Sequence, residues 1–515
     1  MALLSIVYVH SKGVRLSNDA YQYLSIAENL RTRGKIATSI VHFDTERARG
    51  RLPAPETTFP PGYSLAFNSL LWTRVSPEQA AWLISMFSMI SVVPFLWWSS
   101  GLIGATAGLR RITVAVWALN SQAIAYSSAV SSEGLFTVLV LSAIALFIFC
   151  ESRSQRNIKV LVPLAMTLIG VSYWVRYAAI LVVGGLIVYM GYLVLSRNSQ
   201  RWPWLWSLPV CLAFICCGML RNSRIAGTWR GGNDVVVHKA WFTAIVLLKG
   251  VCYHLLFGDL KATLSVGVFL SVSTGLAIAL ILVKYTRKIN YQELLSPPVP
   301  LLVILTATYC GGMTYLGTVT MISFGERYFV PILPEFILLS VALLTRLWPV
   351  KGQPGIHWLI PLLAIVGMSA YASENIYSLF RYPYVPPHAT LANFFSEQTP
   401  DGVSLKLWVD QRILGDAPIL AADGQATAYL LHRPTVSVVP KVFSSRNWDE
   451  EEVRRTMSIY HIRYLVTYPG LSAQDATEQG ESQFLARLTN APPPSWLVLI
   501  TRTPHVMIFE TTATH

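Results

Sequence analysis

The sequence has few charged residues for its length. Asp, Glu, Lys and Arg make up 13% of the 515 residues, whereas 53% are hydrophobic and the mean hydropathy is +0.47. Soluble globular proteins carry about 25% charged residues, because charged side chains must cover their surface. The composition therefore excludes a soluble chain of this size and predicts a polytopic α-helical membrane protein.

Cysteine is also scarce, and its spacing matches no common metal site. No C-x-x-C pair of the kind that binds zinc is present, and no cysteine falls in the polar stretch after residue 388. We expect the cysteines to pack as small hydrophobic side chains and no disulfide framework to hold the C-terminal stretch. The six are Cys150, Cys211, Cys216, Cys217, Cys252 and Cys310.

The sequence shows no cleavable signal peptide and no internal repeat. Met1–Val9 is apolar but lacks a basic region and a small-residue cleavage site. We interpret it as the outer half of a first span that is incomplete or begins upstream of Met1. Further apolar runs approach the roughly 20 residues that a span requires, which predicts about eleven spans in total. These runs are Ala80–Ile103, Ile112–Val130, Leu135–Cys150, Val160–Val175, Tyr177–Leu195, Trp204–Leu220, Thr263–Val283, Val299–Ile322, Phe329–Leu344 and His357–Tyr371.

The formal net charge of +13 indicates membrane topology rather than a nucleic-acid partner. Lys and Arg lie between apolar runs and form no basic stripe on a soluble segment. Clusters such as Arg110-Arg111 recur in alternate connections, and the positive-inside rule places them in the cytoplasm. The segments that this orientation assigns to the outer face are residues 11–61, 131–133, 176, 221–239 and 325–328, and everything after residue 371.

The C-terminal stretch has a soluble composition and predicts a separate domain. Residues 1–375 are expected to form the membrane-embedded domain, with an outer loop at 11–61, and residues 388–515 a small α/β domain on the outer side. Ala417–Ala422, Tyr464–Tyr468 and Trp496–Phe509 have the apolar patterns of strands. Asp449 is expected to begin a helix that runs toward Tyr460.

Several polar side chains lie at the outer ends of apolar runs. Asp19 precedes an amphipathic helix, and two interpretations are open. It is a helix N-cap, with Ser17 or Asn18 as the other candidates, or it belongs to a functional site. Glu133 begins a span and has a similar alternative as a first-turn charge favoured by the helix dipole. The arginines of the outer face, among them Arg176, also have two interpretations. They belong to a functional site, or they are anchors whose side chains reach the lipid headgroups.

The order of these residues resembles the C-type (GT-C) membrane glycosyltransferases. The resemblance rests on Asp19 in the first outer loop, Pro60-Pro61-Gly62-Tyr63 before a short helix, Ser132-Glu133, and Arg327-Tyr328 followed by Pro331. More narrowly, it resembles the bacterial branch related to protein mannosyltransferases and the aminoarabinose transferase of lipid A. It covers the whole chain in architecture, although each motif is short.

The resemblance implies transfer of a sugar from a polyprenyl-phosphate carrier to a lipid, glycan or protein acceptor. The reaction takes place at the outer face of a bacterial inner membrane, and an acidic residue of the first loop, here Asp19, is the catalytic base. Many members carry an acidic pair at this point, whereas the neighbour here is Asn18. No divalent metal is therefore indicated, although one is compatible with the family.

The chemistry assigns further roles. A phosphate leaving group needs no general acid, so one carboxylate is sufficient to deprotonate the acceptor hydroxyl. Direct displacement inverts the anomeric centre. Glu133, the second expected catalytic residue, would position the acceptor or modulate Asp19. Guanidinium groups bind phosphate through paired hydrogen bonds. The expected phosphate-binding residues are Arg327, Arg221, Arg176 and Arg224, and the expected substrate-binding residues are Tyr21, Tyr23, Pro61, Tyr63, Asn222 and Tyr328.

Two other classes compete with this interpretation. A transporter or flippase of lipid-linked glycans would have broken helices at mid-membrane depth, and Gly311-Gly312 is the feature in its favour. A membrane scaffold leaves the polar residues of the outer face unexplained. Glu335 lies in an apolar run and needs a partner if it is buried.

Overall fold

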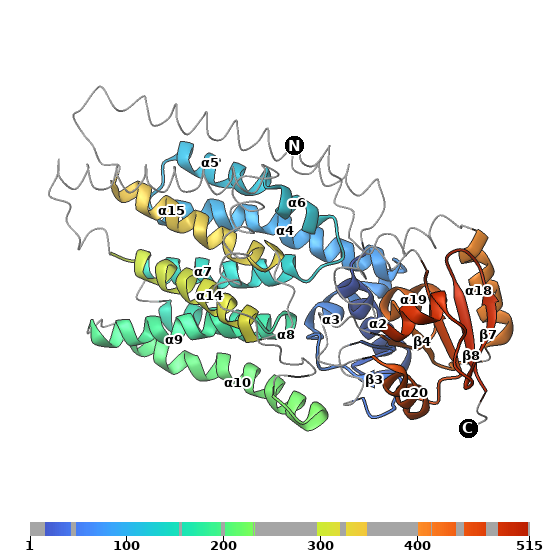
Figure 1. Ribbon diagram of the computed structural model, residues 1–515. Coiled ribbons are helices and arrows are strands. Elements are labelled where there is room, and N and C mark those ends of the chain that lie inside the picture. Colours follow the sequence, from blue (N-terminus) through green and yellow to red (C-terminus); the bar gives the residue numbers. More distant parts are fainter. Residues whose placement is uncertain are drawn as a thin grey trace.

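The computed structural model describes residues 16–42, 48–153, 157–196, 201–229, 231, 296–319, 326–347, 400–413, 415–438, 448–469 and 483–512. Within these ranges the chain forms a bundle of long helices and a mixed α/β domain. The α/β domain packs beyond one end of the bundle, where helix α2 (Asn18–Arg33) and the short helix α3 (Gly62–Asn68) also lie (Figure 1).

The bundle is built from helices with little polar surface. Five are long and apolar enough to cross a membrane: Pro77–Leu102, Glu133–Ser152, Ile158–Val175, Trp202–Ala226 and Val299–Thr318. The chain is thus a multi-pass membrane protein. The predicted spans at residues 1–9, 263–283 and 357–371 lie outside the described residues, so the total of about eleven stays a prediction. The bundle helices are α4 (Pro77–Leu102), α5 (Ala107–Ala118), α6 (Ser121–Ser127), α7 (Glu133–Arg153), α8 (Ile158–Val175), α9 (Ala179–Leu195), α10 (Arg201–Ala226), α14 (Val299–Val319) and α15 (Leu333–Leu347).

Two details of the bundle differ from the prediction. The run Ile112–Val130 is not one span but two short helices, because Asn120 interrupts it and its side-chain oxygen accepts from the Ala123 N–H at 2.9 Å, which caps α6. Conversely, Gly311-Gly312 does not break α14, which continues through both glycines. A Cβ at Gly312 would lie 2.4 Å from Leu181 Cδ2, so this glycine allows close packing of α14 against α9.

The first loop is a compact, structured segment. Its helix α2 (Asn18–Arg33) ends at Gly34, which adopts a φ of 62°, a left-handed conformation that glycine tolerates. Short strands β1 (Ala37–Thr38), β2 (Ile40–Val41) and β3 (Ala54–Pro55) follow, then helix α3 (Gly62–Asn68) and the 3₁₀ turn η1 (Leu71–Thr73). Two further 3₁₀ turns, η3 (Glu326–Tyr328) and η4 (Val330–Ile332), precede α15.

The terminal domain contains the predicted strands and two strands that were not predicted, β2 and β5 (Thr435–Ser437). Its six-stranded sheet has the order β2-β5-β4-β6-β8-β7, in which the first four strands are parallel and the last two pair antiparallel. The edge strand β2 comes from the first loop and pairs with β5 through Ile40 opposite Thr435. The remaining elements are α18 (Pro400–Arg412), β4 (Ile419–Ala421), α19 (Gly424–Leu431), β5 (Thr435–Ser437), α20 (Glu450–Ile459), β6 (Tyr464–Thr467), α22 (Gln483–Asn490), β7 (Leu497–Arg502) and β8 (Met507–Thr511).

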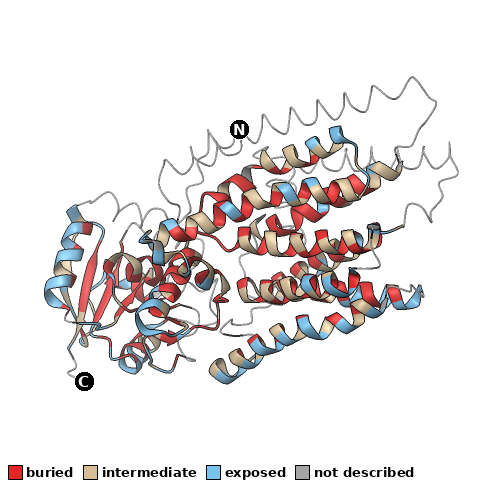
Figure 2. Ribbon diagram, turned by 180° about the vertical axis from the view of Figure 1, so that it is seen from behind, coloured by how far each residue is buried: buried red, intermediate tan, exposed pale blue. Residues whose placement is uncertain are grey.

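Helices cover both faces of this sheet. On one face α20 and α22 bury Val453 and Leu485 against the strands. On the other face α18 and α19 form a core that also contains Tyr21 of α2. Buried residues therefore line the strands and the inner sides of the helices, whereas α18 is exposed outward (Figure 2). A helix of the first loop is thus part of the terminal domain's own core.

Candidate active site

Asp19 is held at the start of α2 and points to a distant arginine. Ser17, rather than Asp19, caps the helix, because its side chain accepts from the Ala20 N–H at 3.4 Å. Asp19 follows in the first turn, where the helix dipole stabilises a negative charge. Its Oδ2 accepts from Arg327 Nη1 at 2.9 Å, and the two side chains are 25% and 27% exposed. In the described part of the chain Oδ1 of Asp19 accepts no hydrogen bond, so this oxygen is free to receive a proton.

A second ion pair is more deeply buried. Arg176, directly after α8, donates from Nη1 to Glu133 Oε1 at 2.8 Å, and these side chains are 11% and 4% exposed. The same nitrogen lies 3.0 Å from Ser132 Oγ, which in turn shares a hydrogen bond of 2.9 Å with the Tyr23 hydroxyl. Burial raises the pKa of Tyr23, so its hydroxyl stays neutral. Helices α2, α7 and α8 therefore meet in one polar network.

Tyr328 lies between the two ion pairs. Arg327 Nη2 donates to its hydroxyl at 2.9 Å. The guanidinium carbon of Arg327 lies 4.9 Å from the ring centroid, and that of Arg176 lies 5.6 Å from it. Burial lowers the pKa of Arg327, but Asp19 and Tyr328 together hold it above its ordinary value, so the guanidinium remains charged. The structure thus gathers Asp19, Glu133, Arg176, Arg327, Tyr23 and Tyr328, all predicted site residues, in one cluster.

Three other residues that were predicted to contact the substrate, Tyr21, Pro61 and Tyr63, are buried in this structure. Tyr21 and Tyr63 are 1% and 0% exposed, so stacking of these rings on a sugar is corrected to a packing role. The Tyr63 hydroxyl donates to the Ala81 carbonyl at 2.8 Å, and its ring contacts Tyr23 edge-on at 5.1 Å between centroids. Pro61 is buried at the start of α3. Tyr63 thus packs directly against Tyr23, whereas Tyr21 packs against Tyr429.

The predicted arginines of α10 lie elsewhere. Arg221 donates from Nη2 to the Glu56 carbonyl at 2.7 Å and from Nη1 to Asn222 Oδ1 at 3.3 Å. Tyr177 donates to the neighbouring Thr57 carbonyl at 3.0 Å. Arg221 and Asn222 therefore fix the loop before Pro60, and the structure does not place them in contact with Asp19. Arg224 is exposed on α10.

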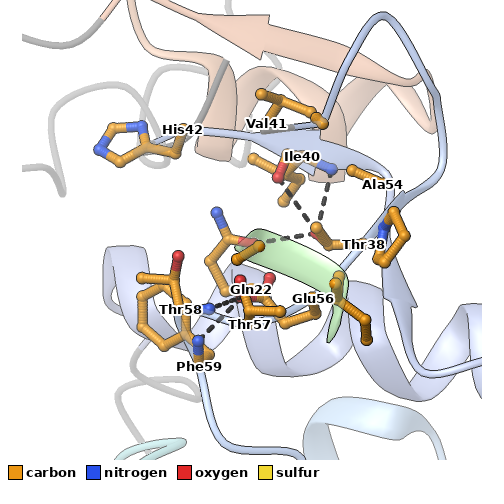
Figure 3. A pocket seen from close by; sticks show the side chains of 14 residues that line it. Gln22, Thr38, Ile40, Val41, His42, Ala54, Glu56, Thr57, Thr58 and Phe59 are labelled. Carbon is orange, nitrogen blue, oxygen red and sulfur yellow. Dashed lines mark hydrogen bonds between the residues drawn. The ribbon is translucent and has the colours of Figure 1, made fainter. Parts of the chain in front are cut away.

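A small pocket opens beside this loop (Figure 3). It has a volume of about 30 Å³, which is room for about two water molecules. Gln22 of α2 and the segments around Thr38 and Glu56 form most of its wall, and α10 closes one side with Ile225 and Ala226. Sequence reasoning did not identify Gln22, because nothing in the sequence shows that it faces a pocket.

Comparisons with known proteins give a consistent result for the fold. No protein-family model matches the sequence, and no curated protein matches it. Among solved structures, the chain is similar to ArnT from Cupriavidus metallidurans in the apo state, with 11% identity, a TM-score of 0.57, and 99% of this chain and 96% of that chain covered. It is similar to the same protein bound to undecaprenyl phosphate, with 10% identity, a TM-score of 0.56, and 100% and 97% covered. It also resembles arabinofuranosyltransferase AftD from Mycobacteria, with 15% identity, a TM-score of 0.50, and 100% and 41% covered.

The chain has the GT-C glycosyltransferase fold. ArnT, with which it shares almost its full length, has the same fold. Helix α2, whose first turn carries Asp19, lies at the end of the bundle where the terminal domain packs (Figure 1). Within the described residues, no three His, Cys, Asp or Glu side chains are arranged to hold a metal ion.

The GT-C bundle and the terminal domain meet through a contact that the sequence did not predict. Tyr429 of α19 donates its hydroxyl to Glu78 at the start of α4, and its ring lies 5.1 Å from that of Tyr21. Tyr429 packs against the cores of both parts. Arg33, at the other end of α2, also pairs with Asp416 of the terminal domain at 3.0 Å. The helix that carries Asp19 is thus held by the terminal domain at two points.

Glu335 lies outside the polar network. It is fully buried in the first turn of α15, and neither carboxylate oxygen has a hydrogen-bond partner among the described residues. The prediction that this carboxyl group needs a partner is therefore not met by any described side chain. The helix dipole favours its position, and the site chemistry does not involve it.

Proposed function

We propose that this chain transfers a sugar from a polyprenyl-phosphate carrier to an acceptor hydroxyl at the membrane surface, with inversion of the anomeric centre. The ion pair between Asp19 and Arg327 carries the proposal. It joins a carboxylate with one free oxygen to a guanidinium that remains charged. A base and a phosphate-binding cation side by side are what displacement of a phosphate requires. The shared fold with ArnT, which binds undecaprenyl phosphate, supports the choice of donor.

The reaction is written as a single displacement. The acceptor oxygen attacks C1 of the sugar, the bond between C1 and the phosphate oxygen breaks, and polyprenyl phosphate leaves with the bonding electrons. Oδ1 of Asp19 takes the acceptor proton, while Oδ2 stays on Arg327. Arg327, with Arg176 behind it, stabilises the charge on the departing phosphate. Glu133 keeps Arg176 in place through their ion pair, so its role is positioning.

The arrangement of the chain supports a periplasmic setting for the proposed reaction. Helices α2 and α3 of the first loop lie with the terminal domain at one end of the bundle (Figure 1). In a bacterial inner membrane the arginine-rich loops would face the cytoplasm, which puts this end at the periplasmic side. The acceptor is then a lipid, glycan or protein of the cell envelope. The uninterrupted course of α14 through Gly311 and Gly312 removes the main feature in favour of a transporter.

Asp19→Asn tests the proposal. The amide keeps the size of the side chain and its bond to Arg327 through oxygen, but it cannot accept a proton from the acceptor. We expect the rate of transfer from a polyprenyl-phosphate sugar to fall by at least about 100-fold, which is in the range of general-base catalysis. Donor affinity, measured separately with the unreactive polyprenyl phosphate, should change little.

Asp401→Asn is the matched control. Asp401 also lies in the first turn of a helix, α18, but in the terminal domain. Its replacement should leave transfer at the rate of the unmodified protein. Equal rates for Asp19→Asn and the unmodified protein would remove Asp19 as the base.

A further inference from the structure

The pocket of Figure 3 contains an uncommitted hydrogen-bond donor. Gln22 is 2% exposed, and its Oε1 accepts from the Thr38 hydroxyl at 2.9 Å. Within the described part of the chain, its Nε2 donates no hydrogen bond. In Figure 3 this nitrogen lies on the side of the amide away from Thr38 and points into the space between Thr58 and His42. This N–H is therefore able to donate to an acceptor atom that enters the pocket.

The rest of the wall mixes polar and apolar side chains and presents no free carboxylate. The one acidic side chain is Glu56, whose Oε1 already accepts from the backbone N–H groups of Thr58 at 2.6 Å and Phe59 at 2.8 Å. Thr57 and Thr58 contribute to the lining, and Phe59 adds an aromatic ring. The hydroxyls and the Gln22 amide can bond a neutral polar group, and apolar side chains such as Ile40 and Ile225 can pack against its carbon atoms. A cation would need a free anion, and an alkyl chain would leave the polar groups unpaired.

The pocket lies beside the proposed base. Gln22 follows Asp19 by three residues on α2, and side chains with this spacing are neighbours, about 5–6 Å apart at Cβ. The opposite wall contains Ile40 and Val41 of β2, the edge strand of the terminal sheet. A molecule whose hydroxyl is placed at Asp19 can therefore reach the pocket with an adjacent group.

We propose that this pocket binds one uncharged polar substituent, a hydroxyl or an amide, of a carbohydrate acceptor, and that Gln22 Nε2 donates a hydrogen bond to it. The inference rests on the proposed transfer reaction and narrows the acceptor from any nucleophile to a glycan. The volume of about 30 Å³ admits a substituent but not a whole sugar ring. The remainder of the acceptor would lie over the mouth of the pocket, above Asp19.

Cysteine protection tests the pocket without requiring turnover. Thr58 lines the pocket and is half-buried, so Thr58→Cys introduces a thiol that a maleimide can reach. The protein is placed in nanodiscs free of sugar detergents, and labelling at residue 58 is followed by peptide mass. The probes are octyl glycosides of glucose, galactose and N-acetylglucosamine, with octanol as the control. We expect at least one glycoside to slow labelling relative to octanol.

Gln22→Glu then tests whether Nε2 of Gln22 donates the hydrogen bond to the glycoside. The carboxylate keeps an oxygen for Thr38 but removes the N–H, so the protecting glycoside should bind about three- to tenfold more weakly. Gln79→Glu makes the same change on the exposed first turn of α4 and should leave protection unchanged. Melting curves of both variants verify that they fold.

The outcomes separate this inference from the proposed function. Labelling that no glycoside slows, or protection that survives Gln22→Glu, would overturn the pocket assignment. Protection should persist in the Asp19→Asn variant, because Asp19 does not line the pocket. If glycosides protect residue 58 but the protein never transfers sugar, the pocket assignment stands and the proposed activity is wrong. If the protein transfers sugar but no glycoside protects residue 58, the proposed activity stands and the pocket assignment is wrong.

Discussion

At the scale of single residues, Arg327 has two partners that use different parts of its guanidinium. Nη1 binds Asp19 and Nη2 binds the Tyr328 hydroxyl. A guanidinium presents five N–H donors in a planar fork, whereas an ammonium is a single point of charge. Arg327 therefore has donors left for a phosphate while it holds the base, which a lysine could not do in the same geometry.

We predict that Arg327 contributes to the affinity for the sugar donor. Arg327→Ala removes charge-assisted hydrogen bonds worth about 1.5–3 kcal/mol, which corresponds to about 10- to 100-fold weaker binding of polyprenyl phosphate. Arg327→Lys should recover part of that loss, because it restores charge without the fork. Arg33→Ala, which breaks an exposed pair with Asp416, serves as the control and should bind normally. Donor affinity that is unchanged in Arg327→Ala would contradict a phosphate role.

The sequence reveals which residues are charged but not which of them pair. Four charged residues can be recognised in the sequence because each interrupts or borders an apolar run, where a charge is costly unless it is paired. They are Asp19, Glu133, Arg176 and Arg327. Asp19 and Arg327 are 308 positions apart, so their contact depends on packing that no local pattern records. The burial of Tyr63 was missed for the same reason, since an interfacial and a core tyrosine look alike in sequence.

At the scale of elements, the turn Pro60-Pro61-Gly62-Tyr63 brings α3 against the end of α8. A Cβ at Gly62 would lie 2.5 Å from the Trp174 carbonyl oxygen and 2.7 Å from its carbon. Both contacts are with backbone, which cannot rotate away as a flexible side chain would. The motif was predicted to precede a helix, and it does. The sequence could not show that its glycine is required by a neighbour 112 positions later.

Gly62→Ala is expected to destabilise this junction. Forcing a methyl group into a packed site costs about 1–3 kcal/mol, so the melting temperature should fall. Transfer should fall with it, since Arg176 lies two residues after Trp174. Gly108→Ala is the control, because the nearest atom, Thr106 Oγ1, lies 4.0 Å away and alanine is favoured in a helix. A normal melting temperature for Gly62→Ala would show that α3 and α8 can separate without cost.

At the scale of the whole molecule, the first loop belongs to both parts of the chain. Its helix α2 contributes Tyr23 to the bundle and Tyr21 to the terminal core, and β2 adds a strand to the terminal sheet. A two-residue strand that pairs with a segment almost 400 positions later leaves no signal in the sequence. The division at residues 375 and 388 was therefore predicted from composition alone, and it stays a proposal to which the first loop must be added.

Tyr429 tests whether the terminal domain positions the base. Tyr429→Phe keeps the ring against Tyr21 but removes the hydrogen bond to Glu78, whereas Tyr429→Ala removes both contacts. If the domain holds α2 in place, the turnover number should fall in steps from Phe to Ala, while the affinity for polyprenyl phosphate changes less, because Arg327 is carried by another element. Trp496→Phe, on the opposite face of the sheet, loses a bond to Glu450 and controls for general loss of domain stability. If the Tyr429 and Trp496 variants lose activity only in proportion to their unfolded fraction, the terminal domain does not position the base. A larger loss at Tyr429 at equal stability would instead make it part of the catalytic unit, because the same helix then transmits the contact to Asp19.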